Sequence, residues 1–184
     1  MSQTAEYIKR LSSLKEGERS LLRRLSGESL DKELQGFDLF TGLWWPLREK
    51  NQAAPQRETS WLVAKLFCSF RVPHIRPDSG SGLSLPQVLG RCEPNEEKKK
   101  KRFRNRFDSL ICTSLSSLEP HLSWALGEVA RAVAGHVSYA RDVQGIDWVQ
   151  LLDDLSLWDR GDEHRQRYDV RDVWAKKYLN TVTK

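Results

Sequence analysis

Apolar residues recur at helical spacing along most of the chain, and this pattern constrains the fold more than any other feature. Near the C-terminus, five large apolar residues share one side of a predicted helix, because residues three and four apart lie on the same face: Trp148, Leu151, Leu152, Leu155 and Trp158. β-Branched residues are few, and no Asn-Gly or Asp-Gly hairpin signal occurs. We therefore predict an all-α protein, a compact bundle of about eight helices that could form two helical subdomains.

The clearest loop separates two groups of predicted helices. Its sequence, "PHIRPDSGSGL" at residues 73–83, contains two prolines and two Gly-Ser elements, which favour turns over helix. The chain is therefore divided into an N-terminal helical subdomain, a linking loop with a short helix, and a C-terminal helical subdomain, which we assign to residues 1–72, 73–95 and 96–184.

Helix ends are predicted from short polar residues and prolines. Thr4, Ser84 and Asp147 each stand before an apolar-periodic stretch and are predicted N-caps, because their side chains can accept hydrogen bonds from free N–H groups of the first turn. Pro46 is predicted to break a helix, since proline has no N–H and clashes with the preceding turn. The apolar segment 56–72 is predicted to be a buried helix that ends before Pro73.

Cysteine usage and hydropathy indicate the cellular compartment of the protein. The three cysteines are far apart, and Cys68 and Cys112 lie in apolar runs, so we predict buried thiols rather than a disulfide framework. The N-terminal stretch has charges within its apolar pattern and does not resemble a signal peptide. No apolar stretch is long enough to cross a membrane. We predict a cytoplasmic location.

The sequence lacks the residue patterns of common active sites. The four histidines have no H-x-x-x-H or H-x-x-E-H spacing, and no P-loop, G-x-S-x-G or G-x-G-x-x-G motif is present. Asp153 and Asp154 are adjacent, so they point to different helix faces and are predicted to lie on the solvent side. The three C-terminal tryptophans lie on leucine-rich faces and are predicted to be core. We therefore predict no enzymatic activity, no metal and no cofactor.

The basic stretch "KKKKRFRNRF", residues 98–107, is the strongest functional signal. On a helical wheel, Phe103 and Phe107 begin the apolar stripe of a helix that runs to about residue 118. The phenylalanines are therefore predicted to dock this helix against the core. The basic residues occupy its flanks, with Lys99, Arg102 and Arg106 in one row and Lys101 and Arg104 toward the other side.

A basic helix held in place by aromatic residues suits a phosphate backbone. The net charge is +5 and the sequence pI is about 9.2, which favours an anionic partner. Fixed guanidinium forks match phosphate oxygens, and such contacts carry affinity without sequence information. A solvated helix with excess positive charge would give the same pattern, although cations in the first turn oppose the helix dipole.

Five short segments, in order along the chain, span most of residues 17–180 and read "GERSLLRRLSG", "GLSLPQVL", "NRFDSLI", "IDWVQLLDDLSLWD" and "VRDVWAKKYL". Together they resemble motifs of the CasB family, the small subunit of the type I-E CRISPR complex Cascade. The resemblance implies an all-α, non-catalytic subunit that sits as a pair in the complex beside other Cascade subunits and crRNA. It also implies that the chain helps to hold the target and displaced DNA strands of the R-loop, while crRNA pairing reads the sequence.

The resemblance and the charge pattern together define the candidate nucleic-acid-binding residues. Arg24 stands in the L-R-R segment, Arg57 at the start of the buried helix where the family carries a basic residue, and Arg106 in the basic-aromatic helix. The charge of this sequence itself extends the set by four residues: Lys99, Lys101, Arg102 and Arg104. Family members often carry arginines on the following helix, where this chain has Ser123 and Trp124. An alternative hypothesis is a protein-only helical adaptor that docks an acidic protein partner.

Overall fold

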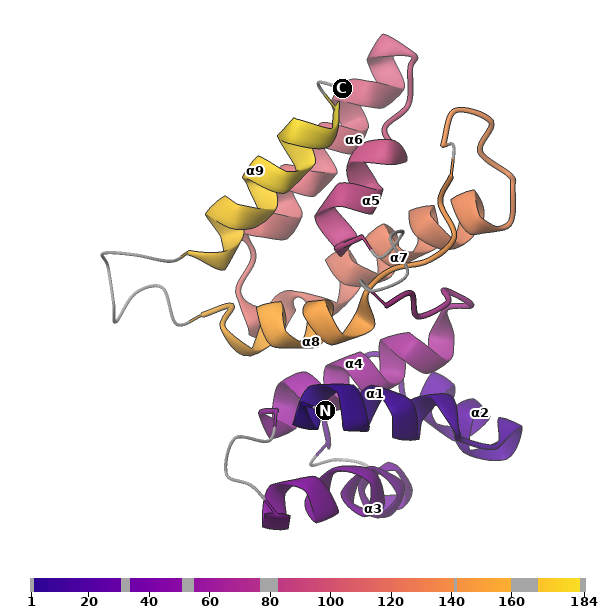
Figure 1. The fold of residues 1–184 in the computed structure, drawn as a ribbon, viewed down its shortest axis with the longest axis vertical. Helices are drawn as coiled ribbons and strands as arrows, with labels where there is room; N and C mark the ends of the chain where they lie inside the picture. Colours follow the sequence, from indigo (N-terminus) through magenta and orange to yellow (C-terminus); the bar gives the residue numbers. More distant parts are fainter. Residues whose placement is uncertain are drawn as a thin grey trace. The chain divides into compact units, whose positions relative to one another are not determined.

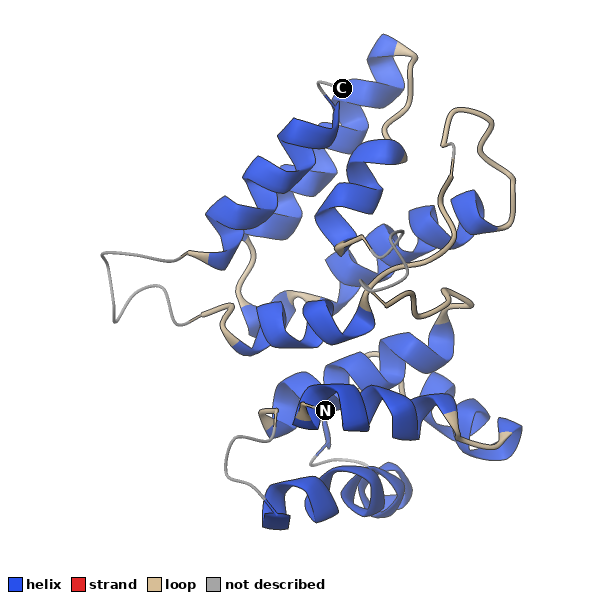
Figure 2. Cartoon of the chain, viewed as in Figure 1, coloured by secondary structure: helices blue, strands red, loops and turns tan. Residues whose placement is uncertain are grey.

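The computed structural model describes residues 2–30, 34–50, 55–76, 83–140, 142–159 and 169–182, of which 34, 35 and 50 are described by their backbone alone. Within these ranges every regular element is a helix (Figure 2), and the one strand-like contact is an isolated parallel bridge between His74 and Ile146. The predicted all-α fold class is confirmed. The chain forms two compact units, Met1–Arg71 and Val72–Lys184, each described below by itself.

The first unit contains α1 (Gln3–Ser12), α2 (Glu16–Arg24), α3 (Leu34–Lys50) and α4 (Arg57–Ser69). Helix α4 is its centre, because its apolar residues lie on most sides of the helix and nearly all are buried. The buried hydroxyl of Tyr7 in α1 donates a hydrogen bond to the carbonyl of Ser60 in α4 at 2.8 Å. The predicted buried helix is confirmed, and it ends at Ser69.

Two predicted helix ends in the first unit are wrong. Helix α1 is capped by Ser2, whose side chain accepts from the Ala5 N–H at 3.1 Å, and Thr4 is buried in the first turn. Pro46 does not end α3, which continues to Lys50. Phe40 and Leu47, on either side of the proline, are both buried. Their packing keeps the helix intact, although Pro46 has no N–H to donate to the preceding turn.

The second unit contains α5 (Leu85–Arg91), α6 (Glu97–Cys112), a 3₁₀ turn (Leu115–Ser117), α7 (Glu119–Val133), α8 (Trp148–Ser156) and α9 (Val170–Val182). Helix α9 lies along α5 and α6 (Figure 1). It approaches α5 closely at Gly90, where an added Cβ would lie 2.8 Å from the Cβ of Thr181. The predicted N-caps Ser84 and Asp147 are confirmed, and Asp147 accepts from the N–H groups of Val149 and Gln150.

Three tryptophans form the centre of the second unit's core, as predicted. Trp148, Trp158 and Trp174 are at most 2% exposed, and the rings of Trp158 and Trp174 meet edge to face at 4.8 Å. The indole N–H of Trp174 donates to Asp154 at 2.7 Å, and Gln150 donates to the same carboxylate. Burial raises the pKa of Asp154. The predicted solvent position of Asp154 is therefore wrong, because the residue is needed as a buried acceptor.

The basic helix α6 is shorter than predicted. It ends at Cys112 instead of near residue 118, and the chain turns there so that the carbonyl of Thr113 accepts from the indole N–H of Trp158 at 2.9 Å. Cys112 is exposed at this end, contrary to prediction, while Cys68 and Cys92 are buried. Most of the predicted loop at 73–83 lies outside the described residues. None of the described helices is long and apolar enough to cross a membrane.

Candidate nucleic-acid interface

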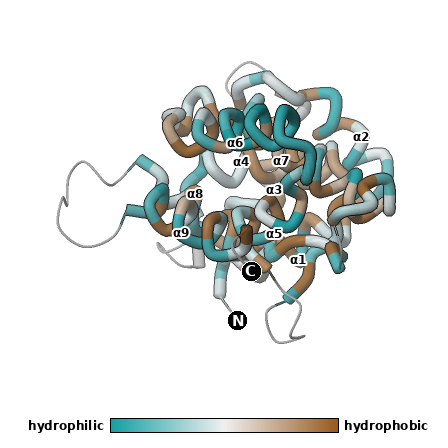
Figure 3. Tube along the Cα trace, turned by 90° about the horizontal axis from the view of Figure 1, so that it is seen from above, coloured by the Kyte–Doolittle hydropathy of each residue, from teal (hydrophilic) through white to brown (hydrophobic). Residues whose placement is uncertain are grey.

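Two buried phenylalanines attach α6 to its neighbours. Phe103 and Phe107 are 5% and 3% exposed, which confirms that they face the core. Phe107 stacks on Tyr178 of α9 with ring centroids 4.1 Å apart, and Phe103 packs edge-on against Trp124 of α7 at 5.1 Å. The helix is therefore held from two sides, although most of its residues are hydrophilic (Figure 3).

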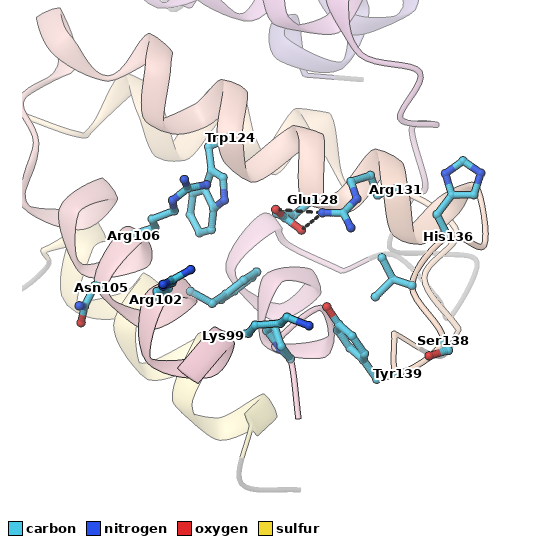
Figure 4. A pocket seen from close by; sticks show the side chains of 13 residues that line it. Lys99, Arg102, Asn105, Arg106, Trp124, Glu128, Arg131, His136, Ser138 and Tyr139 are labelled. Carbon is cyan, nitrogen blue, oxygen red and sulfur yellow. Dashed lines mark hydrogen bonds and ion pairs between the residues drawn. The ribbon is translucent and has the colours of Figure 1, made fainter. Parts of the chain in front are cut away.

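The row formed by Lys99, Arg102 and Arg106 lines an open cleft of about 680 Å³. The opposite wall comes from α7 and the segment that follows it. Figure 4 shows Arg106 beside Trp124, and Lys99 pointing toward Tyr139. The described residues that line the cleft are Pro94, Lys99, Arg102, Phe103, Asn105, Arg106, Trp124, Glu128, Arg131, His136, Val137, Ser138 and Tyr139.

The arginines of this row are exposed and available to a ligand. Among the described residues, neither Arg102 nor Arg106 forms an ion pair, whereas Lys99 pairs with Glu96 at 2.7 Å. The guanidinium of Arg106 lies 5.7 Å from the centroid of the Trp124 ring, within the range of a cation–π contact. The cleft thus presents two fork-shaped cations whose helix is fixed by its buried aromatic residues.

The far wall of the cleft holds residues outside the set predicted from the sequence. Arg131 pairs with Glu128 at 3.1 Å, and both lie in the cleft with Trp124. Positions 124, 128 and 131 have the i, i+4, i+7 spacing of one helical face. The sequence therefore indicates that these three side chains lie on the same side of the helix. The residues from His136 to Tyr139 follow the end of the helix and carry no such signal.

Arg104 and Lys100 face a different partner, the buried carboxylate of Glu93. Arg104 donates two hydrogen bonds of 2.9 Å to it, Lys100 lies 3.6 Å away, and the hydroxyl of Tyr178 donates as well. We call these four residues the Glu93 cluster. Burial alone would raise the pKa of Glu93, but the hydrogen bonds from Arg104 and Tyr178 outweigh it and hold the pKa below its usual value. Arg104 therefore does not line the cleft.

The remaining candidate residues are dispersed. Lys101 is exposed on the outer face of α6 and does not line the cleft. Arg24 is exposed at the end of α2 in the first unit. Arg57 begins α4 in the same unit, where its guanidinium lies 5.9 Å from the ring centroid of Phe37 and 3.5 Å from Glu58.

The part of the chain that the structure describes contains no group of three or more His, Cys, Asp or Glu side chains that could hold a metal ion. His74 instead has a structural contact, since its Nδ1 accepts the backbone N–H of Trp148 at 3.2 Å. Burial lowers the pKa of His74, which favours the neutral ring that accepts this bond.

Comparison with known proteins identifies the family. Residues 18–179 match the model of the family described as CRISPR-associated protein Cse2. The chain belongs to the Cse2 family. The resemblance to CasB, the small subunit of Cascade, is thereby confirmed. No curated protein matches the chain.

Solved structures of this family share the fold. The match to the CasB structure from M. ruber spans 100% of this chain and 95% of that chain, with a TM-score of 0.72 and 19% identity. TTHB189, a Cse2 family protein from Thermus thermophilus, has a TM-score of 0.63 and 22% identity over 96% of each chain. A CasB structure from the same organism has a TM-score of 0.59 and 21% identity over 96% of each chain. At these identities the match establishes the helical fold of this Cse2 protein.

Proposed function

We propose that this Cse2 protein is a non-catalytic nucleic-acid-binding subunit of a type I-E Cascade complex. It stabilises the R-loop of crRNA and target DNA through sequence-independent contacts to backbone phosphates. Its partners are the other Cascade subunits, a second copy of the chain, crRNA, and the target and displaced DNA strands. The observation that carries the proposal is the gathering of Lys99, Arg102 and Arg106 along one cleft, with both arginines outside any ion pair of the described residues.

The physical argument rests on fixed positive charge. Phe103 and Phe107 hold α6 in place, so the arginines lose less freedom on binding than a mobile lysine run would. A guanidinium fork can bind two phosphate oxygens at once. The row follows the helix for two turns, so it can follow the backbone of a strand without reading its bases.

The salt dependence of DNA binding tests the phosphate contacts. We expect the observed binding constant of the full chain to fall with salt, with a log–log slope that counts the phosphates neutralised. Arg102→Ala combined with Arg106→Ala should reduce the magnitude of this slope by about 1.4 on single strands and about 1.8 on duplex, or about 0.7 and 0.9 per contact. Fluorescence anisotropy with labelled oligonucleotides at about 50 to 200 mM salt measures it.

A matched control removes the same charge elsewhere. Lys9→Ala combined with Lys176→Ala takes two exposed cations from positions outside the cleft and should leave the slope unchanged. A wild-type slope in the Arg102/Arg106 variant would refute the cleft as the phosphate site. Single substitutions of Arg24, Arg57, Lys101 and Arg104 by alanine test the other candidate positions in the same assay.

Cascade membership of the chain is tested by co-purification with crRNA and larger subunits. The alternative adaptor function predicts a different outcome. DNA binding would be negligible at low salt, while an acidic protein partner would remain bound after nuclease treatment. That pair of results would replace the nucleic-acid function by the adaptor.

A further inference from the structure

Trp124 lies in the cleft beside the row of Lys99, Arg102 and Arg106 and is half-buried. The buried ring of Phe103 meets the indole at 67° and 5.1 Å, which fixes the position of the tryptophan. Arg106 lies over the indole ring, 5.7 Å from its centroid. A cation–π contact at an exposed site is weak, so Arg106 can exchange the ring for a phosphate at little cost.

The charges of the cleft differ from one wall to the other. The wall formed by α6 carries Lys99, Arg102 and Arg106, which attract phosphate. On α7, the side chain of Glu128 is 19% exposed and is paired with Arg131, so this wall has no net charge. Beside Trp124 the cleft therefore suits an uncharged aromatic group better than a second phosphate.

We propose that the cleft takes an unstacked base of a single DNA strand, which stacks on Trp124 while Arg102 and Arg106 bind the adjacent phosphates. This inference rests on the proposed function, because the displaced strand of an R-loop is single-stranded and its bases are free to leave the stack. Aromatic side chains beside a basic row are the usual platform for single strands, and they tolerate any base. In a duplex the faces of the bases are covered by stacking, so only the phosphate contacts contribute to its affinity for the cleft.

Two oligomers of equal length and charge test the inference: oligothymidylate and an abasic deoxyribose-phosphate strand. The full-length protein is expected to bind the thymine strand about 5- to 150-fold more tightly at the same salt concentration. Trp124→Leu should bring this ratio close to one without changing the salt slope, whereas Trp124→Phe should keep most of it. Trp45→Leu removes a tryptophan of the first unit that is 54% exposed and does not line the cleft, and it should leave the ratio unchanged.

Different failures separate the two proposals. Equal binding of both strands by the wild type, with the salt slope intact, would overturn the base site and leave the phosphate function standing. An unchanged ratio in Trp124→Leu would also overturn the base site. A salt slope near zero would overturn both. If circular dichroism shows that Trp124→Leu does not fold, the wild-type ratio and the Trp124→Phe variant decide.

Discussion

Glu93→Gln is expected to lower the free energy of unfolding of the protein by about 3 kcal/mol. The Glu93 side chain is 5% exposed and accepts two hydrogen bonds from Arg104 and one from Tyr178. Removing one charge from a buried ion pair costs about 3–5 kcal/mol. The Arg104 side chain is 44% exposed and regains water, so the low end of this range applies.

Thermal unfolding followed by circular dichroism measures this effect. For a chain of this size, a loss of about 1 kcal/mol lowers Tm by about 2–4 °C, so we expect a fall of about 6–12 °C near pH 7. Glu96→Gln is the control, because Glu96 also pairs with a cation of α6, Lys99, but both side chains are more than half exposed. The Glu96→Gln variant should melt close to the wild-type Tm, because an exposed ion pair contributes little to stability.

In acid, the Tm of Glu93→Gln should approach that of the wild type. The pKa of Glu93 is held below its usual value in the folded protein. Its contribution is therefore complete at a pH above the unfolded pKa of about 4.3 and is lost as the pH falls through the folded pKa. The Tm gap between wild type and Glu93→Gln should narrow as the pH falls below about 4. Equal Tm values at pH 7, or a gap that stays constant in acid, would refute the reasoning.

Substitutions at two further positions test the packing and capping of the second unit by urea unfolding. Gly90→Ala should cost about 1–3 kcal/mol, because the new Cβ would lie 2.8 Å from Thr181 Cβ and 3.0 Å from the Tyr178 carbonyl oxygen. An unchanged urea midpoint would show that α9 can shift to make room. Asp147→Ala should cost about 0.5–2 kcal/mol by removing the cap of α8, and Asp147→Asn should restore most of the loss. Equal losses in both Asp147 variants would contradict the capping role.

Features set by local spacing could be predicted from the sequence. The inward direction of Phe103 and Phe107 follows from the helical period, and so does the row of Lys99, Arg102 and Arg106. The cap at Asp147 depends on the two or three residues that follow it. These features need no knowledge of the tertiary partners.

Features set by tertiary partners could not be predicted. Arg104 looks like any other cation of the basic run, and its partner Glu93 lies eleven residues earlier, before α6 begins. Asp154 is buried because the indole of Trp174, twenty residues later, requires an acceptor. Trp124 reaches the cleft through the packing of α7 on α6, which no single helical period describes.

The position of α9 has a consequence for synthesis of the protein. The helix packs along α5, which begins at Leu85, and its buried residue Tyr178 stacks on Phe107 of α6. Both α5 and α6 are made much earlier than α9. A ribosome must therefore release about ninety further residues after the start of α5 before the second core can close. Until then, the partners of α9 expose apolar surface. A nascent chain interrupted before Val170 would lack part of its core and would be a target for chaperones and proteases.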